Sequence, residues 1–310
     1  GLGDVYKRQA MSTRTNWLLL VGVILLALPS AAWTQATQQQ LFVTVVDATT
    51  GQGVHDLGAE HFVVQEDGVQ RQILGASLAT EPLEIAILVD TSEAARSIMR
   101  EVQEGVSAFV EGLRFNIGLG IGDQVALMTF GGARFILVDW TSDLEQLKEG
   151  ATKLRSRQGT GTFLPDAVND TAKDFSEREA ARPVLVVVSA DGIDYSSHRD
   201  FRRIIQELRG SYTLMYSVFI PTASRRMTLN WDSRERDAVL TEGPRLTGGR
   251  RINLSGRQAI TGALIGIQNE LTSQYVVTYH RPESPVPPQR LSLGVTRPNL
   301  TVRLTPRKPQ

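Results

Sequence analysis

The sequence predicts an α/β protein: a doubly wound, mostly parallel sheet with one antiparallel edge strand, plus a small β module formed from the N-terminal and C-terminal segments. Three observations predict this fold class. Residues 85–90 and 183–191 are continuous apolar runs, as in strands that are covered on both faces. Amphipathic helical patterns separate and follow these runs. Shorter alternating segments, typical of half-buried strands, lie near both ends of the chain.

Two N-terminal segments precede the predicted fold. Residues 1–10 have neither the charge pattern nor the apolar core of a targeting segment, and we interpret them as a non-native leader ahead of Met11. Residues 11–36 place Arg14 before an apolar run of about 12 residues and then small residues, as a secretory signal does. The run is shorter than the roughly 20 residues that span a bilayer. We therefore expect a secreted or periplasmic protein with no membrane insertion after signal cleavage.

Composition limits the classes of partner. The chain has 310 residues, with 33 Lys and Arg and 33 Asp and Glu, so its formal net charge is zero. No basic surplus exists to neutralise a phosphate backbone, and nucleic acid is not expected as a partner. The sequence contains no cysteine, so export would not depend on disulfides.

The β segments at the two ends of the chain carry turn signals. Asp67-Gly68 between two alternating runs is typical of a β-hairpin, and Pro298-Asn299 separates two further strands. Each piece is too small to bury a face alone, and domain termini often lie close together. We therefore predict that the end segments pair, so that the α/β domain is inserted in a small β-sandwich. The predicted N-terminal β module, α/β domain, Pro-rich linker and C-terminal strands are residues 41–80, 83–280, 281–289 and 290–305.

The elements of the α/β domain follow from apolar periodicity. In order we expect a strand at 85–90, a helix at 98–113, a hairpin of strands 124–130 and 134–140, helices at 144–154 and after 162, a strand at 183–191, a helix at 201–208, a strand at 212–220, a helix at 260–271 and a last strand at 274–280. The hairpin supplies the antiparallel edge, because its connection is too short for a crossover. Polar residues 221–236 are interpreted as a loop near the functional edge of the sheet.

Three loops carry oxygen-bearing side chains at the carboxyl ends of the predicted strands. Asp90 and Ser92 follow the first strand, Thr162 precedes a helix, and Asp191 and Asp194 follow a later strand. Loops at this edge of an open α/β sheet share one crevice. Two carboxylates and two hydroxyls match the ligands of a hard divalent cation. A single Asp at a strand end is more often a helix cap or loop anchor, so only the combination of the three loops indicates a metal site.

Residues 83–280 resemble a von Willebrand factor type A domain, which has a Rossmann-like fold. The family's metal ion-dependent adhesion site combines an Asp-x-Ser-x-Ser loop, a Thr and a further Asp, and "DTSEA", "GTFLPDA" and "SADG" are similar to these three parts. The resemblance implies that Asp90, Ser92, Thr162 and Asp191 bind Mg²⁺, or else Mn²⁺ or Ca²⁺. With its β segments, the chain is similar to the bacterial von Willebrand-related secreted proteins of the acidobacteria.

One position departs from the family pattern. Ala94 stands where the resemblance implies a second serine ligand, so water, Glu93 or nothing fills that coordination position. Glu93 and Asp194 are candidates for supporting the ligands through hydrogen bonds. Losing even a supporting partner typically weakens metal affinity by roughly 10- to 100-fold, and a direct ligand should count for at least as much.

Two functions remain open, and there is a third alternative. The first is an exported protein-binding or adhesion module, in which the cation accepts a carboxylate from a protein ligand that presents Asp or Glu. The second is a metal-free structural or interaction scaffold with a decayed site. The third alternative is a metal-dependent hydrolase. We do not expect an enzyme, because no GxSxG motif is present and no argument places a histidine beside Ser92 or Ser189.

Overall fold

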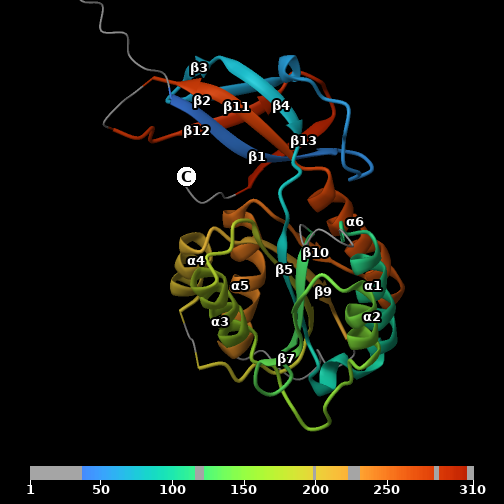
Figure 1. Ribbon diagram of the computed structural model, residues 1–310. Coiled ribbons are helices and arrows are strands. Elements are labelled where there is room, and N and C mark those ends of the chain that lie inside the picture. Colours follow the sequence, from blue (N-terminus) through green and yellow to red (C-terminus); the bar gives the residue numbers. More distant parts are fainter. Residues whose placement is uncertain (1–36, 116–121, 198–199, 223–230, 283–285, 306–310) are drawn as a thin grey trace, which may run out of the picture. The chain divides into compact units, whose positions relative to one another are not determined.

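A six-stranded sheet lies between two layers of helices in the computed structural model (Figure 1). The strand order is β10-β9-β8-β5-β6-β7, and every neighbouring pair is parallel except β6 with β7. The strands are β5 (Glu84–Val89), β6 (Gln124–Thr129), β7 (Phe135–Thr141), β8 (Pro183–Ala190), β9 (Leu214–Ile220) and β10 (Arg251–Asn253). The predicted doubly wound, mostly parallel sheet with one antiparallel edge strand is therefore confirmed.

The structure describes residues 37–115, 122–197, 200–222, 231–282 and 286–305. The predicted leader and signal, residues 1–10 and 11–36, lie outside these ranges. Among the described helices, none combines the length and the apolar character that a bilayer crossing requires.

Three helices cover each face of this sheet (Figure 1). One face carries α1 (Met99–Glu111), α2 (Leu144–Thr152) and α6 (Ile260–Thr272), and the other carries α3 (Leu164–Glu177), α4 (Phe201–Gly210) and α5 (Trp231–Thr247). Asp143 caps α2 by accepting hydrogen bonds from two backbone N–H groups of its first turn, and Asp200 caps α4 by accepting one. Short 3₁₀ turns occupy η1 (Ala59–His61), η2 (Glu93–Ile98) and η4 (Arg257–Ala259).

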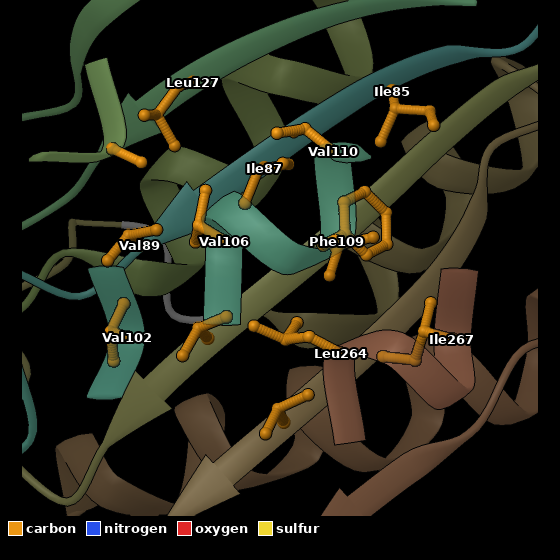
Figure 2. Close-up of a cluster of buried hydrophobic side chains, with 14 of the residues drawn as sticks. Ile85, Ile87, Val89, Val102, Val106, Phe109, Val110, Leu127, Leu264 and Ile267 are labelled. Carbon is orange, nitrogen blue, oxygen red and sulfur yellow. The ribbon is translucent and has the colours of Figure 1, made fainter. Parts of the chain in front are cut away.

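The central strands are apolar on both faces because helices cover both. Along β5, Ile85, Ile87 and Val89 belong to the core shared with α1 and α6, whereas Ala86 and Leu88 belong to the opposite core. Figure 2 shows the first of these cores, in which side chains of α1 lie between β5 and α6. This two-sided burial is the physical origin of the continuous apolar runs in the sequence.

The end segments form two antiparallel sheets that share one core. The four-stranded sheet has the order β13-β1-β11-β4 and the three-stranded sheet β12-β2-β3. Their strands are β1 (Thr37–Asp47), β2 (Phe62–Glu66), β3 (Val69–Arg71), β4 (Ile73–Leu78), β11 (Tyr275–Arg281), β12 (Leu291–Val295) and β13 (Leu300–Thr305). Strand β13 pairs with β1 and β12 with β2, which confirms the predicted pairing of the two end segments.

Turn chemistry and chain connections follow the sequence signals. Asp67 and Gly68 join β2 to β3 and both have positive φ, at 50° and 82°, as the tight hairpin requires. The chain enters the α/β part after β4 and leaves it through β11, and these two strands pair with each other. Leu78 lies opposite Tyr275 at this point, so entry and exit are adjacent.

Three sequence predictions need correction. The strand expected at 274–280 is present as β11, but it belongs to the four-stranded antiparallel sheet and not to the α/β sheet. Its burial alternates, with Tyr275, Val277 and Tyr279 inside, as a half-covered strand requires. The sixth strand of the α/β sheet is the short β10 instead. Residues 231–236, interpreted as loop, begin α5, and residues 223–230 lie outside the described ranges.

Candidate functional site

The loop after β5 is held by hydrogen bonds to the Asp90 carboxylate. Asp90 is 2% exposed, and its two oxygens accept hydrogen bonds from the backbone N–H groups of Ser92, at 2.9 Å, and Ala190, at 3.0 Å. Ala190 is the last residue of the neighbouring strand β8. Asp90 thus joins the carboxyl ends of β5 and β8, the edge at which an open α/β sheet binds ligands.

Glu93 is directed toward residues 157–160 rather than toward Ala94. Its Oε2 accepts a hydrogen bond from the backbone N–H of Gly159 at 2.9 Å, and its Oε1 lies 3.4 Å from Arg96. Its backbone N–H donates to the carbonyl of Thr160 at 3.1 Å. In this arrangement Glu93 ties the first loop to the second.

Thr162, in the second loop, bonds to the third loop. It forms isolated bridges with Gly131 and Asp194, and its hydroxyl donates to Asp194 Oδ2 at 2.7 Å. The Asp194 carboxylate also accepts from the backbone N–H groups of Leu164, at 3.1 Å, and Ser196, at 2.9 Å. Leu164 is the first residue of α3, so Asp194 satisfies a free helix N–H from a distant loop.

Asp191 has one engaged oxygen and one free oxygen. Its Oδ1 accepts hydrogen bonds from the Thr222 backbone N–H, at 2.9 Å, and from the Thr222 hydroxyl. Its Oδ2 is buried and has no hydrogen-bond partner. Thr222 lies two residues after the end of β9 and has no counterpart in the predicted site.

The three loops converge at Gly192. A Cβ atom on Gly192 would lie 3.2 Å from each of Ser92 Oγ, Ala94 Cβ and Thr162 Cγ2. A side chain at this position would crowd both other loops, so glycine permits the close approach. The loops that the sequence analysis expected to share one crevice do meet, and Ala94 faces the meeting point.

Burial dominates the electrostatics of Asp90. It raises the pKa of the carboxyl above its ordinary value, and hydrogen bonds from Ser92 and Ala190 offset part of the rise. The Ser92 hydroxyl lies near enough to contribute, although its Oγ has no partner in hydrogen-bond geometry. The positive charge of Arg236 also lowers this pKa.

Arg236 is, with Thr222, a residue of this site that the sequence analysis did not single out. It projects from α5, is 4% exposed, and donates a hydrogen bond to the carbonyl of Gly192. Its Nε is buried without a hydrogen-bond partner. No motif distinguishes it from the other charged residues in "DSRERD", so only the fold reveals its position.

The oxygen atoms of the three loops meet part of what a divalent cation requires of its ligands. Among the described residues, no group of three or more His, Cys, Asp or Glu could hold a metal, so a cation here would also need hydroxyl ligands. Ser92 Oγ and Asp191 Oδ2 are buried oxygens without hydrogen-bond partners, and oxygen ligands of this kind suit Mg²⁺ or Ca²⁺. The Thr162 hydroxyl is committed to Asp194 and would have to rotate to join them.

Apolar side chains border the same edge. Ile193 and Tyr195, on the loop that carries Asp191 and Asp194, are 41% and 57% exposed. The Tyr195 ring packs on Phe163, with 6.1 Å between ring centroids. The edge therefore combines buried oxygens with exposed apolar surface.

The chain is similar to known proteins mainly in its fold. Residues 85–193 match the family model of the von Willebrand factor type A domain. No curated protein sequence matches the chain. Proximal thread matrix protein 1 from the mussel byssus is 13% identical, with a TM-score of 0.50 over 67% of this chain and 50% of that one.

Two further solved structures are similar at lower TM-scores. A von Willebrand factor type A protein from Catenulispora acidiphila is 15% identical, with a TM-score of 0.48 over 76% of this chain and 50% of that one. The mussel protein described with a zinc-occupied MIDAS motif, the metal ion-dependent adhesion site, is 11% identical, with a TM-score of 0.49 over 63% and 49%. Over residues 85–193 the family match and the fold are therefore those of a von Willebrand factor type A domain.

Proposed function

We propose that the protein is an exported interaction module whose partner binds at the edge around Gly192 and presents Asp or Glu to a divalent cation. Von Willebrand factor type A domains are adhesion and protein-interaction modules. The finer proposal is carried by two buried oxygens without hydrogen-bond partners, Ser92 Oγ and Asp191 Oδ2, on the loops that follow the two strands joined by Asp90.

The proposed ligands would contribute in two ways, through their negative charge and through the geometry of the coordination shell. Asp90 and Asp191 supply negative charge, and Ser92 supplies a neutral oxygen, with Thr162 as a further ligand once its hydroxyl turns from Asp194. A hard cation, Mg²⁺ or else Mn²⁺ or Ca²⁺, would offer an open coordination position that favours an anionic oxygen. The methyl group of Ala94 leaves one neutral ligand missing. The charges that attract the cation are kept and the coordination shell is loosened.

The apolar border supports a protein partner. Ile193 and Tyr195 are exposed beside the proposed site, and aromatic side chains are enriched in protein interfaces. A partner carboxylate flanked by apolar residues would match both features. We also propose, from the predicted signal at residues 11–36, that the protein acts after export, as a secreted or periplasmic protein. We propose no catalytic activity.

One observation favours a metal-free interaction scaffold as the second candidate. The Thr162 hydroxyl already has an acceptor in Asp194, and Arg236 already donates a hydrogen bond to the carbonyl of Gly192. Both contacts stabilise the loops without a cation. The two candidates share the same binding edge and differ in whether a metal is needed.

A metal titration separates these candidates. Calorimetric titration of the wild-type protein with Mg²⁺, Mn²⁺ and Ca²⁺ should show weak binding, and Ala94→Ser should tighten Mg²⁺ binding by about tenfold or more, about 1.4 kcal/mol per tenfold. Mg²⁺ should gain more than Ca²⁺, because Mg²⁺ demands a nearly ideal octahedron. Asp90→Ala should abolish binding in both backgrounds.

Asp139→Ala is the matched control, because it removes an exposed carboxylate of β7 and should leave metal affinity unchanged. If neither wild type nor Ala94→Ser binds any of the three ions, the metal-dependent function is wrong and the metal-free scaffold is favoured.

A further inference from the structure

We propose that Arg236 is a built-in cation of this site, which competes with a divalent metal ion for the negative charge of Asp90 and thereby sets the metal affinity. The inference rests on the proposed function, since it concerns the same loops. It assigns a role to a residue outside the three motif loops.

The Arg236 side chain reaches the point where the loops converge. It comes from α5, on the face of the sheet opposite to α1, and reaches the carbonyl of Gly192, the residue at which the three loops converge. The side chain is 4% exposed, so solvent screens its charge poorly. The guanidinium therefore lies at the meeting point of the loops.

The hydrogen-bonding capacity of the Arg236 guanidinium is incompletely used. A guanidinium has five N–H donors, and a buried charge is costly unless it is paired. Arg236 donates to one carbonyl and its Nε has no partner. Among the described residues, no carboxylate forms a direct ion pair with it. The charge remains available to an anion near Gly192, which closely approaches Ser92 in the loop that Asp90 holds.

The charge of Arg236 would have opposite effects on the site without and with a metal ion. Without a metal, Arg236 supplies a positive charge that partly balances the buried Asp90 carboxylate. A divalent cation at Asp90, Ser92 and Asp191 would meet a fixed like charge in a region of low dielectric, where repulsion is strong. The same side chain thus stabilises the metal-free loops and weakens metal binding. Together with Ala94, it shifts the site away from tight metal binding.

Arg236→Met tests this inference, because Met keeps much of the apolar stem and removes the charge. Mg²⁺ and Mn²⁺ affinity, measured by calorimetry on the full chain, should rise about tenfold or more, as expected when a nearby like charge is removed. Arg236→Lys keeps the charge and should retain roughly wild-type affinity. Arg202→Met removes an exposed arginine of α4 and should leave the affinity unchanged.

The outcomes separate this inference from the proposed function. If Ala94→Ser tightens Mg²⁺ binding but Arg236→Met does not, the role of Arg236 is wrong and the metal site stands. If Arg236→Lys tightens binding as much as Arg236→Met, the charge is not the cause and the inference is overturned. If neither the wild-type protein nor any variant binds an ion, the proposed metal site is wrong, and the role of Arg236 is overturned with it. Circular dichroism checks folding, and Arg236→Gln replaces Arg236→Met if that variant does not fold.

Discussion

At the scale of single residues, Asp194 joins two loops that approach the sheet from different parts of the chain. Its carboxylate accepts hydrogen bonds from the Thr162 hydroxyl, the Leu164 N–H and the Ser196 N–H. Asp194 is 3% exposed and Thr162 is fully buried, so these bonds form away from water. Removing the acceptor would leave buried donors unsatisfied, which costs more than a hydrogen bond contributes.

Asp194→Ala should therefore lower the free energy of unfolding by about 3 kcal/mol, and Thr162→Val by about 1 kcal/mol. Because the two side chains share one hydrogen bond, the double variant should lose less than the sum. Urea denaturation of the four proteins completes the cycle. Additive losses would show that the Thr162–Asp194 bond does not contribute to stability.

The sequence could predict the candidate ligands but not their surroundings. Asp90 and Asp191 follow buried strands directly, so the apolar runs that reveal the strands also place these carboxylates at one edge. Thr222 and Arg236 reach the site through hydrogen bonds to distant loops, and no local pattern marks them. Residue types at strand ends are readable from sequence, whereas long-range partners depend on packing.

At the scale of elements, α1 and α6 pack closely because α1 has a glycine, Gly105, at the point of contact. A Cβ atom on Gly105 of α1 would lie 2.9 Å from Leu264 Cδ1 and 3.3 Å from the Thr261 backbone of α6. Gly266 of α6 has no such neighbour, since a Cβ there would meet only the end of Arg250 at 3.7 Å. The two glycines thus have similar helical settings and different packing.

Gly105→Ala should destabilise the protein by about 1 kcal/mol, because overpacking outweighs the gain in helix propensity. Gly266→Ala is the matched control and should stabilise it by roughly 0.5–1 kcal/mol. Thermal and urea unfolding of both variants measures the difference. Equal stabilisation by both substitutions would mean that α1 and α6 are not in close contact at Gly105.

The elements also show where sequence patterns fail. Strands β5 and β8 are continuous apolar runs and were predicted, but β10 has only three residues, too few for a periodicity. The first two turns of helix α5 are rich in charged residues, and the helix contains Pro244. Its buried apolar residues Val239 and Leu240 are adjacent in sequence and form no apolar stripe with helical spacing. For β11 the sequence indicated a strand, and the sheet it joins was decided by pairing with β1 and β4.

At the scale of the whole molecule, the two ends of the chain complete each other's sheets. Strands β12 and β13 each pair with a strand from the N-terminal segment and contribute apolar side chains to the shared core. The N-terminal segment has four strands, but β11 lies between β1 and β4, and the pair of β2 with β3 alone would be only a marginally stable hairpin.

A chain that ends at residue 289 should therefore have destabilised antiparallel sheets, since β1 keeps only β11 as a partner and β2 keeps only β3. Amide hydrogen exchange should show loss of protection in β1 and β2, because both strands would lose partners. A chain that ends at residue 305 retains both C-terminal strands and should match the full-length protein. Unchanged protection in the shorter chain would contradict the closure of the two sheets by β12 and β13.

The adjacency of β4 and β11 has a consequence for the order of folding. Roughly two hundred residues separate these paired strands, and closing a flexible loop of that length is entropically unfavourable. Once the α/β part has folded, its two ends are held side by side, and a distant pairing becomes a local one. Contacts between remote segments form slowly unless an earlier structure shortens their separation. The edge around Gly192 should therefore be complete before the first and last strands of the chain find each other.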